Sequence, residues 1–222
     1  MIELFGISIS EPMTMLTDYL LAIVAFYLSW RIFQQTAGQQ SRKYWALASV
    51  FIGSAAFWGG TYHGFQTVLT DGQISLCWKL VVYSVGLSTL FFSYGTALAT
   101  LTPKYHKWVL YPSMAKLILC IVWANLSDDF LFVMLDYLVT LLLVVAIFTY
   151  AKLKWGAPSY YYIVAGVIVF FVGTWIQTIG FAMHEHFNHN DLLHILQTVA
   201  VVLFYRGTLL LSDRKKVSVK VV

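Results

Sequence analysis

A polar, histidine-rich stretch interrupts an otherwise apolar sequence near its C-terminal end. It reads His184-Glu-His-Phe-Asn-His-Asn-Asp-Leu-Leu-His194 and holds four of the six histidines of the chain. In a helix, Asn190, Asp191 and His194 would share one face, because residues three and four apart lie about one turn from each other. Side chains of these types at this spacing suit a metal site, a proton relay or a hydrogen-bonded helix start, and the sequence leaves all three open.

Further ionisable residues lie inside the apolar segments that precede this stretch. Each of these residues lies on a different segment: Asp18, His63, Lys79 and Asp136. Together with His194, they lie in the half of the bilayer that the charge pattern of the connectors assigns to the outer side. A charged group inside a bilayer costs about 2.5 to 3.5 kcal/mol on insertion scales, so such a cluster is a candidate functional site. Because neighbouring segments run in opposite directions, His63 and His194 are expected to be neighbours.

Some of these residues also have a purely structural interpretation. Lys79 could form an ion pair with Asp18 or Asp136. Asn190 or Asp191 could be the N-cap of a helix, since Asn and Asp are favoured there. The remaining histidines of the stretch are expected to be loop residues: His184, His186 and His189.

Composition predicts which elements carry these residues. Hydrophobic residues make up 59% of the 222 residues and charged residues 11%, against roughly one quarter charged in soluble domains. The chain resolves into seven apolar segments of about 20 residues, the length that a helix needs to cross a hydrocarbon core of about 30 Å. We therefore predict an all-α, multi-pass integral membrane protein of the plasma or an inner membrane, with one domain over residues 1–222. The expected segments are 13–33, 44–69, 74–101, 106–125, 130–150, 160–183 and 195–211.

The charges of the connectors predict the orientation of the segments. Lysine and arginine occur in alternate connectors and after the last segment, at Arg31, Arg42, Lys43, Lys104, Lys107, Lys152, Lys154, Arg214, Lys215, Lys216 and Lys220. The other connectors and the N-terminal residues hold no Lys or Arg and carry Glu3, Glu11, Asp71, Asp128, Asp129 and Glu185. By the positive-inside rule, the N-terminus lies outside and the C-terminus inside.

The ends of the second and seventh segments resemble a known pattern. His63 lies at the end of the second segment, Asn190-Asp-Leu-Leu-His194 opens the seventh, and Phe204-Tyr-Arg-Gly207 follows. In this respect the chain resembles the seven-helix superfamily that joins the alkaline ceramidases with the adiponectin and progestin receptors. The resemblance implies a seven-helix fold, a zinc ion held by three histidines with a Ser and an Asp nearby, and hydrolysis of lipid amides.

The sequence departs from the superfamily's pattern at that site. Asn190, a poor zinc ligand, stands where the first histidine of the seventh-helix pair is expected, and Gly59 stands where the serine is expected. Lys79 lies in the region of the expected acidic residue. Catalytic zinc usually has three protein ligands, so Asp191 or His189 would have to supply the third.

The first functional hypothesis is an intramembrane zinc hydrolase. It would act on a lipid amide or ester that enters a cavity open to the outer leaflet. His63, His194 and Asp191 would hold the metal, which activates water and polarises the carbonyl. Asp136 or Asp18 would be the general base.

The second hypothesis is a non-enzymatic receptor, sensor or proton-coupled permease. Asp18, Lys79, Asp136 and His194 would then form a buried network without a metal. A membrane lipid is the expected substrate or ligand in the first case and a possible ligand in the second. The sequence contains no phosphate-binding glycine loop and no nucleic-acid signature.

Overall fold

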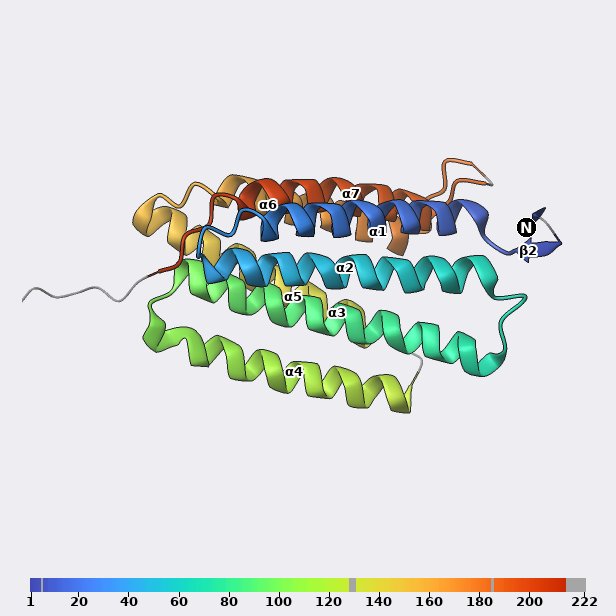
Figure 1. Cartoon of the computed structure of the whole chain (residues 1–222), viewed down its shortest axis with the longest axis horizontal. Helices are drawn as coiled ribbons and strands as arrows, with labels where there is room; N and C mark the ends of the chain where they lie inside the picture. The colour runs from blue at the N-terminus through green and yellow to red at the C-terminus, as the bar shows by residue number, and fades with distance from the viewer. Residues whose placement is uncertain (5, 128–130, 185, 215–222) are drawn as a thin grey trace, which may run out of the picture.

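The chain forms a bundle of α-helices preceded by a short β-hairpin (Figure 1). The computed structural model describes residues 1–4, 6–127, 131–184 and 186–214. In the hairpin, β1 (Ile2–Leu4) pairs antiparallel with β2 (Ile7–Ile9). The described residues form seven helices: α1 (Pro12–Phe33), α2 (Gln40–Phe65), α3 (Asp71–Thr100), α4 (His106–Leu126), α5 (Leu131–Trp155), α6 (Tyr160–Thr178) and α7 (His189–Thr208). A short 3₁₀ helix, η1 (Pro103–Tyr105), precedes α4.

The predicted all-α class and the seven helices are confirmed, whereas several predicted helix ends are wrong. The second helix ends at Phe65, four residues early, and α6 ends at Thr178 instead of residue 183. Gly180 explains the end of α6, because its φ of +67° is a left-handed conformation that glycine adopts without strain. The seventh helix begins at His189 and not at residue 195, so most of the polar stretch belongs to it.

Five helices of the described residues are long and apolar enough to cross a membrane. They are Pro12–Phe33, Asp71–Thr100, Pro103–Leu126, Leu131–Trp155 and Tyr160–Thr178. The remaining two, α2 and α7, each pack against three other helices. Both helices carry polar residues inside the bundle, such as Ser49 on α2 and Asp191 and His194 on α7, which lowers their share of apolar residues.

Six of the helices form a closed ring, and α4 stands outside it. Contacts run from α1 to α2, then to α3, α5, α6 and α7, and from α7 back to α1. The fourth helix packs mainly on α3, with a smaller contact to α5, and Figure 1 shows it at the edge of the bundle. The ring therefore creates an interior that α4 does not reach.

An aromatic cluster fills the ring at the end away from the N-terminus. Trp45 of α2 lies at the centre, with ring centroids 4.6 Å from Phe92, 6.0 Å from Phe148 and 5.7 Å from Phe204. All four side chains are buried. Gly166 lets α6 approach α7 closely here, because a Cβ at this glycine would lie 2.5 Å from the ring of Phe204.

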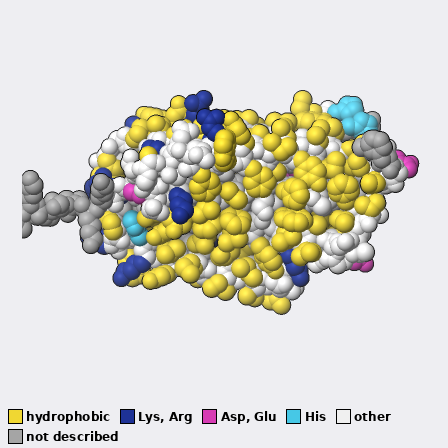
Figure 2. All heavy atoms as spheres, viewed as in Figure 1, with side chains coloured by type: hydrophobic (Ala, Val, Ile, Leu, Met, Phe, Trp, Pro, Cys, Tyr) yellow, Lys and Arg dark blue, Asp and Glu magenta, His cyan; other side chains and the backbone are white. Residues whose placement is uncertain are grey.

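The outer surface of the bundle is largely apolar. Figure 2 shows hydrophobic side chains over most of the visible face, with lysine and arginine more scattered. Ile23 of α1 is 67% exposed, and Ile118 of α4 is 59% exposed. Soluble monomers rarely expose apolar patches larger than a few hundred Å², so this surface is suited to an apolar surrounding.

Candidate functional site

A pocket of about 380 Å³ lies inside the helix ring. All six ring helices contribute to its wall, and none of its lining residues belongs to α4. The wall is mostly apolar and includes Leu21, Ile52, Val85, Phe92, Leu141 and Phe204. Polar side chains of the pocket include Asp18, His63, Gln177, Asn190, His194 and Gln197, with Ser88 and Thr89 on α3. Because Phe92 and Phe204 belong to the aromatic cluster, that cluster forms the apolar floor of the pocket.

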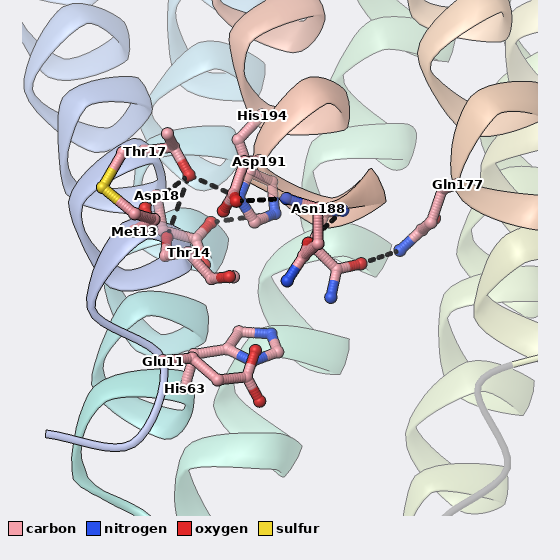
Figure 3. A network of polar contacts seen from close by, with 11 residues as sticks. Glu11, Met13, Thr14, Thr17, Asp18, His63, Gln177, Asn188, Asp191 and His194 are labelled. Atoms are coloured by element: carbon pink, nitrogen blue, oxygen red, sulfur yellow. Dashed lines mark hydrogen bonds and ion pairs between the residues drawn. The ribbon is translucent and has the colours of Figure 1, made fainter. Parts of the chain in front are cut away.

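His194 joins α7 to α1 at the polar end of the pocket (Figure 3). Its Nε2 lies 3.3 Å from Oδ1 of Asp18, and its Nδ1 lies 3.2 Å from the hydroxyl oxygen of Thr17. Both Asp18 and His194 are buried, at 3% and 8% exposure. A neutral imidazole with its proton on Nε2 can donate to the carboxylate and present Nδ1 as an acceptor to the Thr17 hydroxyl, which also lies 3.1 Å from the carbonyl oxygens of Met13 and Thr14. Two consecutive residues of α1 thus engage both ring nitrogens of His194.

The second carboxylate oxygen of Asp18 lies against α2. This Oδ2 has no hydrogen-bond partner among the described residues. A Cβ built on Gly59 would lie 3.1 Å from it, so the absence of a side chain at Gly59 leaves room for the carboxylate. Asp18 therefore approaches α2 at the position where the superfamily resemblance places a serine.

The polar stretch itself builds the start of α7. Asn188 is the N-cap, and its side-chain oxygen accepts from the backbone N–H of Asn190 at 2.8 Å. Asp191 completes a capping box, because its Oδ2 accepts from the backbone N–H of Asn188 at 2.7 Å. The helix is thus capped by Asn188 and not by Asn190 or Asp191. His189, expected in a loop, is the first residue of α7, whereas His184 and His186 do lie in the loop before it.

Asn190, Asp191 and His194, predicted to share one face of α7, each bind a different partner. Oδ1 of Asn190 accepts from Nε2 of Gln177 at 3.0 Å, which connects α7 to α6. Asp191 turns back to the helix cap, and His194 reaches α1. The three side chains therefore do not converge on one point.

His63 lies in the last turn of α2, beside the segment that leads into α1. Its Nδ1 is 3.2 Å from Oε2 of Glu11. The backbone N–H of Glu11 donates to the carbonyl of His63, and that of Ser10 donates to the carbonyl of Gly64. These bonds satisfy carbonyls that the end of a helix leaves without an intrahelical partner. His63 and His194 line the same pocket, as the antiparallel order of the segments predicts.

A partly buried ion pair lies outside the pocket. Nζ of Lys116 on α4 is 2.8 Å from Oδ1 of Asp136 on α5, and Thr89 donates to Oδ2 of Asp136 at 2.8 Å. Asp136 does not line the pocket, although Thr89 does. The pairing of Lys79 with Asp18 or Asp136 is wrong, because His194 and Lys116 take those positions. Lys79 is also absent from the pocket wall.

The expected zinc ligands are not assembled in this arrangement. Within residues 1–4, 6–127, 131–184 and 186–214, no three His, Cys, Asp or Glu side chains are placed to hold one metal ion. The geometry explains this, since Asp191 caps α7, Asn190 binds Gln177 and His63 faces Glu11. The described side chains thus do not fit a three-ligand zinc site, and we derive no reaction step through a metal.

A family assignment follows from the sequence. Residues 13–213 match a family of unknown function, DUF6962, and the match extends from α1 past the end of α7. The chain belongs to this family. No curated protein matches the chain, and no solved structure does. Every helix that lines the pocket lies within the DUF6962 match, so the pocket belongs to the family's domain.

Three polar partners in this DUF6962 chain were not expected as site residues. Thr17 binds His194, Glu11 binds His63, and Lys116 binds Asp136. Thr17 has a weak sequence signal, because it directly precedes a buried aspartate. Glu11 and Lys116 have none, since their partners are 52 and 20 residues away in sequence.

Proposed function

We propose that this protein is a multi-pass membrane protein that binds a lipid-like molecule inside its helix ring. Five apolar helices, an apolar outer surface and the alternation of charge between connectors support membrane insertion, with the N-terminus outside. In this orientation the polar end of the pocket lies toward the outer side. The function would be that of a receptor, sensor or carrier.

The pocket carries this proposal. Its volume of about 380 Å³ falls within the roughly 300 to 1,000 Å³ of small-molecule sites. The wall combines an apolar floor with a small number of polar groups at one end, which is the pattern that orients an amphipathic ligand. An apolar chain would contact Leu141 and Phe204, while a polar head would lie near Asp18, Asn190 and His194.

Extraction of lipids that copurify with the protein tests the proposal. We expect the wild type to retain a defined lipid, measured by mass spectrometry against empty detergent. Ala55→Phe places a larger side chain in the pocket and should remove this lipid. Ala146→Phe is the matched control, because Ala146 is exposed on the outer face of α5. Equal lipid content in both variants would contradict a ligand in the pocket.

Lipid hydrolysis with a metal is the second candidate. One observation bears on it: His63, His194 and Asp18 line one pocket, although among the described residues they are not placed to hold a single metal ion. Elemental analysis of bound zinc in purified wild type, His63→Ala and His194→Ala tests this candidate. His184→Ala, in the loop before α7, is the control. Zinc near one equivalent in wild type and His184→Ala, but lost from the other two, would justify a screen of lipid amides and esters. A folded wild type that holds no metal after loading sinks this candidate.

A further inference from the structure

The charges around the pocket are unbalanced. Among the lining residues in the described part of the chain, Asp18 is the one carboxylate, and there is no lysine or arginine. His63 has its own partner in Glu11, and His194 can serve both of its partners as an uncharged imidazole. A ligand with a phosphate or carboxylate head would therefore meet a like charge and no positive side chain. A positively charged head would meet an opposite charge.

The carboxylate of Asp18 can accept a further hydrogen bond from such a head group. One oxygen accepts from His194, and the other has no hydrogen-bond partner among the described residues. The side chain is buried, and a buried carboxylate without full pairing costs several kcal/mol in real proteins. A cationic group in the pocket would offset this cost. A neutral hydroxyl would offset less of it, because it supplies a hydrogen bond but no opposite charge.

Aromatic rings lie on the path from the outer side to Asp18. Tyr62 and Trp78 line the pocket with ring centroids 5.9 Å apart. The same two residues also line a second cavity of about 340 Å³, together with Asp71, Ile74 and Ser75. Aromatic faces attract ammonium groups, most strongly when the group is desolvated. The second cavity thus adds another carboxylate, Asp71, and shares the two aromatic rings with the pocket.

We propose that the ligand of the pocket is a cationic amphiphile, with an aliphatic amine or ammonium head at Asp18 and an apolar chain along the ring interior. This inference rests on the proposed binding of a lipid-like molecule and adds the charge of its head. The cavity beside Asp71 is the outer approach to the site. Tyr62 and Trp78 separate this approach from the pocket.

Three probes with one chain and different heads test the charge. The protein is placed in phosphatidylcholine nanodiscs, which carry no net surface charge, and is titrated with dodecylamine, dodecanol or dodecanoate. Binding is measured as the saturable change in tryptophan fluorescence, corrected with empty nanodiscs. We expect dodecylamine to bind at least about tenfold more tightly than dodecanol, and dodecanoate to bind most weakly.

Substitutions test whether Asp18 causes the preference for the amine. Asp18→Asn keeps the size of the side chain but removes its charge, and should reduce the preference for the amine to below about threefold. Glu3→Gln is the control, because Glu3 is an exposed carboxylate of the hairpin that does not line the pocket. If Asp18→Asn does not fold, the three probes on the wild type still decide the question.

The outcomes separate the two proposals. Equal affinity for amine and alcohol, or a preference for dodecanoate, overturns the cationic head and leaves the lipid-binding proposal standing. A preference for the amine that persists in a folded Asp18→Asn also overturns the role of Asp18. No saturable binding of any probe overturns both proposals.

Discussion

At the scale of residues, the polar end of the pocket is built from pairs that connect helices. Asp18 and His194 join α1 to α7, and Gln177 and Asn190 join α6 to α7. Each pair satisfies groups that would be costly to bury alone. The same pairing draws the side chains of α7 away from one another, which is why a shared helix face does not become a ligand set here.

The Asp18–His194 pair should stabilise the fold, and the effect of substituting one partner should depend on the other. His194→Ala leaves a buried carboxylate without its donor, and we expect a loss of about 3 to 5 kcal/mol in the free energy of unfolding. Asp18→Asn in the same chain should recover part of this loss, because the remaining group is then uncharged. Thermal unfolding of the two single variants and the double variant measures the coupling. Additive effects would show that the pair is not coupled.

Gly59 should matter for ligand binding because of its position next to Asp18. A serine there would bring a Cβ to about 3.1 Å from Oδ2, and its hydroxyl could donate to that oxygen. We expect Gly59→Ser to weaken dodecylamine binding about three- to tenfold, the equivalent of about one hydrogen bond. Gly72→Ser serves as the control, since a Cβ at Gly72 meets nothing within 4 Å. Wild-type affinity in Gly59→Ser would contradict a role for Oδ2 in binding.

At the scale of elements, one ion pair links α4 to α5, in addition to the apolar contacts of Cys120 and Ala124. The helix packs mainly on α3, with a smaller contact to α5, and the Lys116–Asp136 pair is a charged link to the bundle. The side chain of Asp136 is 1% exposed. This charge therefore relies on Lys116.

Removal of Lys116 should loosen α4. Lys116→Met leaves Asp136 unpaired, and we expect a destabilisation of about 3 to 5 kcal/mol together with faster hydrogen exchange in α4. Lys116→Met combined with Asp136→Leu should recover much of this stability, because no buried charge remains. Lys107→Met, at an exposed position near the start of α4, provides the reference. If Lys107→Met and Lys116→Met behave alike, the ion pair does not hold α4.

The elements were more predictable than the site, for a physical reason. Helix class and number follow from the length and hydropathy of the segments, which are local properties. The burial of Asp18 against Gly59 depends on how α1 packs on α2, and no local pattern reports it. The start of α7 shows the limit within one segment: Asn188 and Asp191 form a capping box, yet the apolar run from Ile195 suggested a later start.

At the scale of the whole molecule, ring closure bears on the number of membrane spans. Among the described helices, five are long and apolar enough to cross a membrane. The other two, α2 and α7, lie in the ring between helices of that kind. A bilayer that surrounds α1, α3, α5 and α6 would also enclose α2 and α7, some of whose polar residues line the pocket, among them His63, Asn190 and His194. Seven spans are therefore expected, with the connector after α1 and the connector after α2 on opposite sides.

Cysteine labelling tests this topology. Both native thiols, Cys77 and Cys120, are free and buried, so a variant with alanine at both positions gives a clean background. We then expect Val68→Cys, in the connector after α2, to react with a membrane-impermeant maleimide on intact cells. Gln34→Cys, after α1, should react only once the cells are permeabilised, because the positive-inside rule predicts that the connectors rich in lysine and arginine lie inside. Labelling of both positions on intact cells would mean that α2 does not cross the membrane, and the ring would then have to lie partly outside the bilayer.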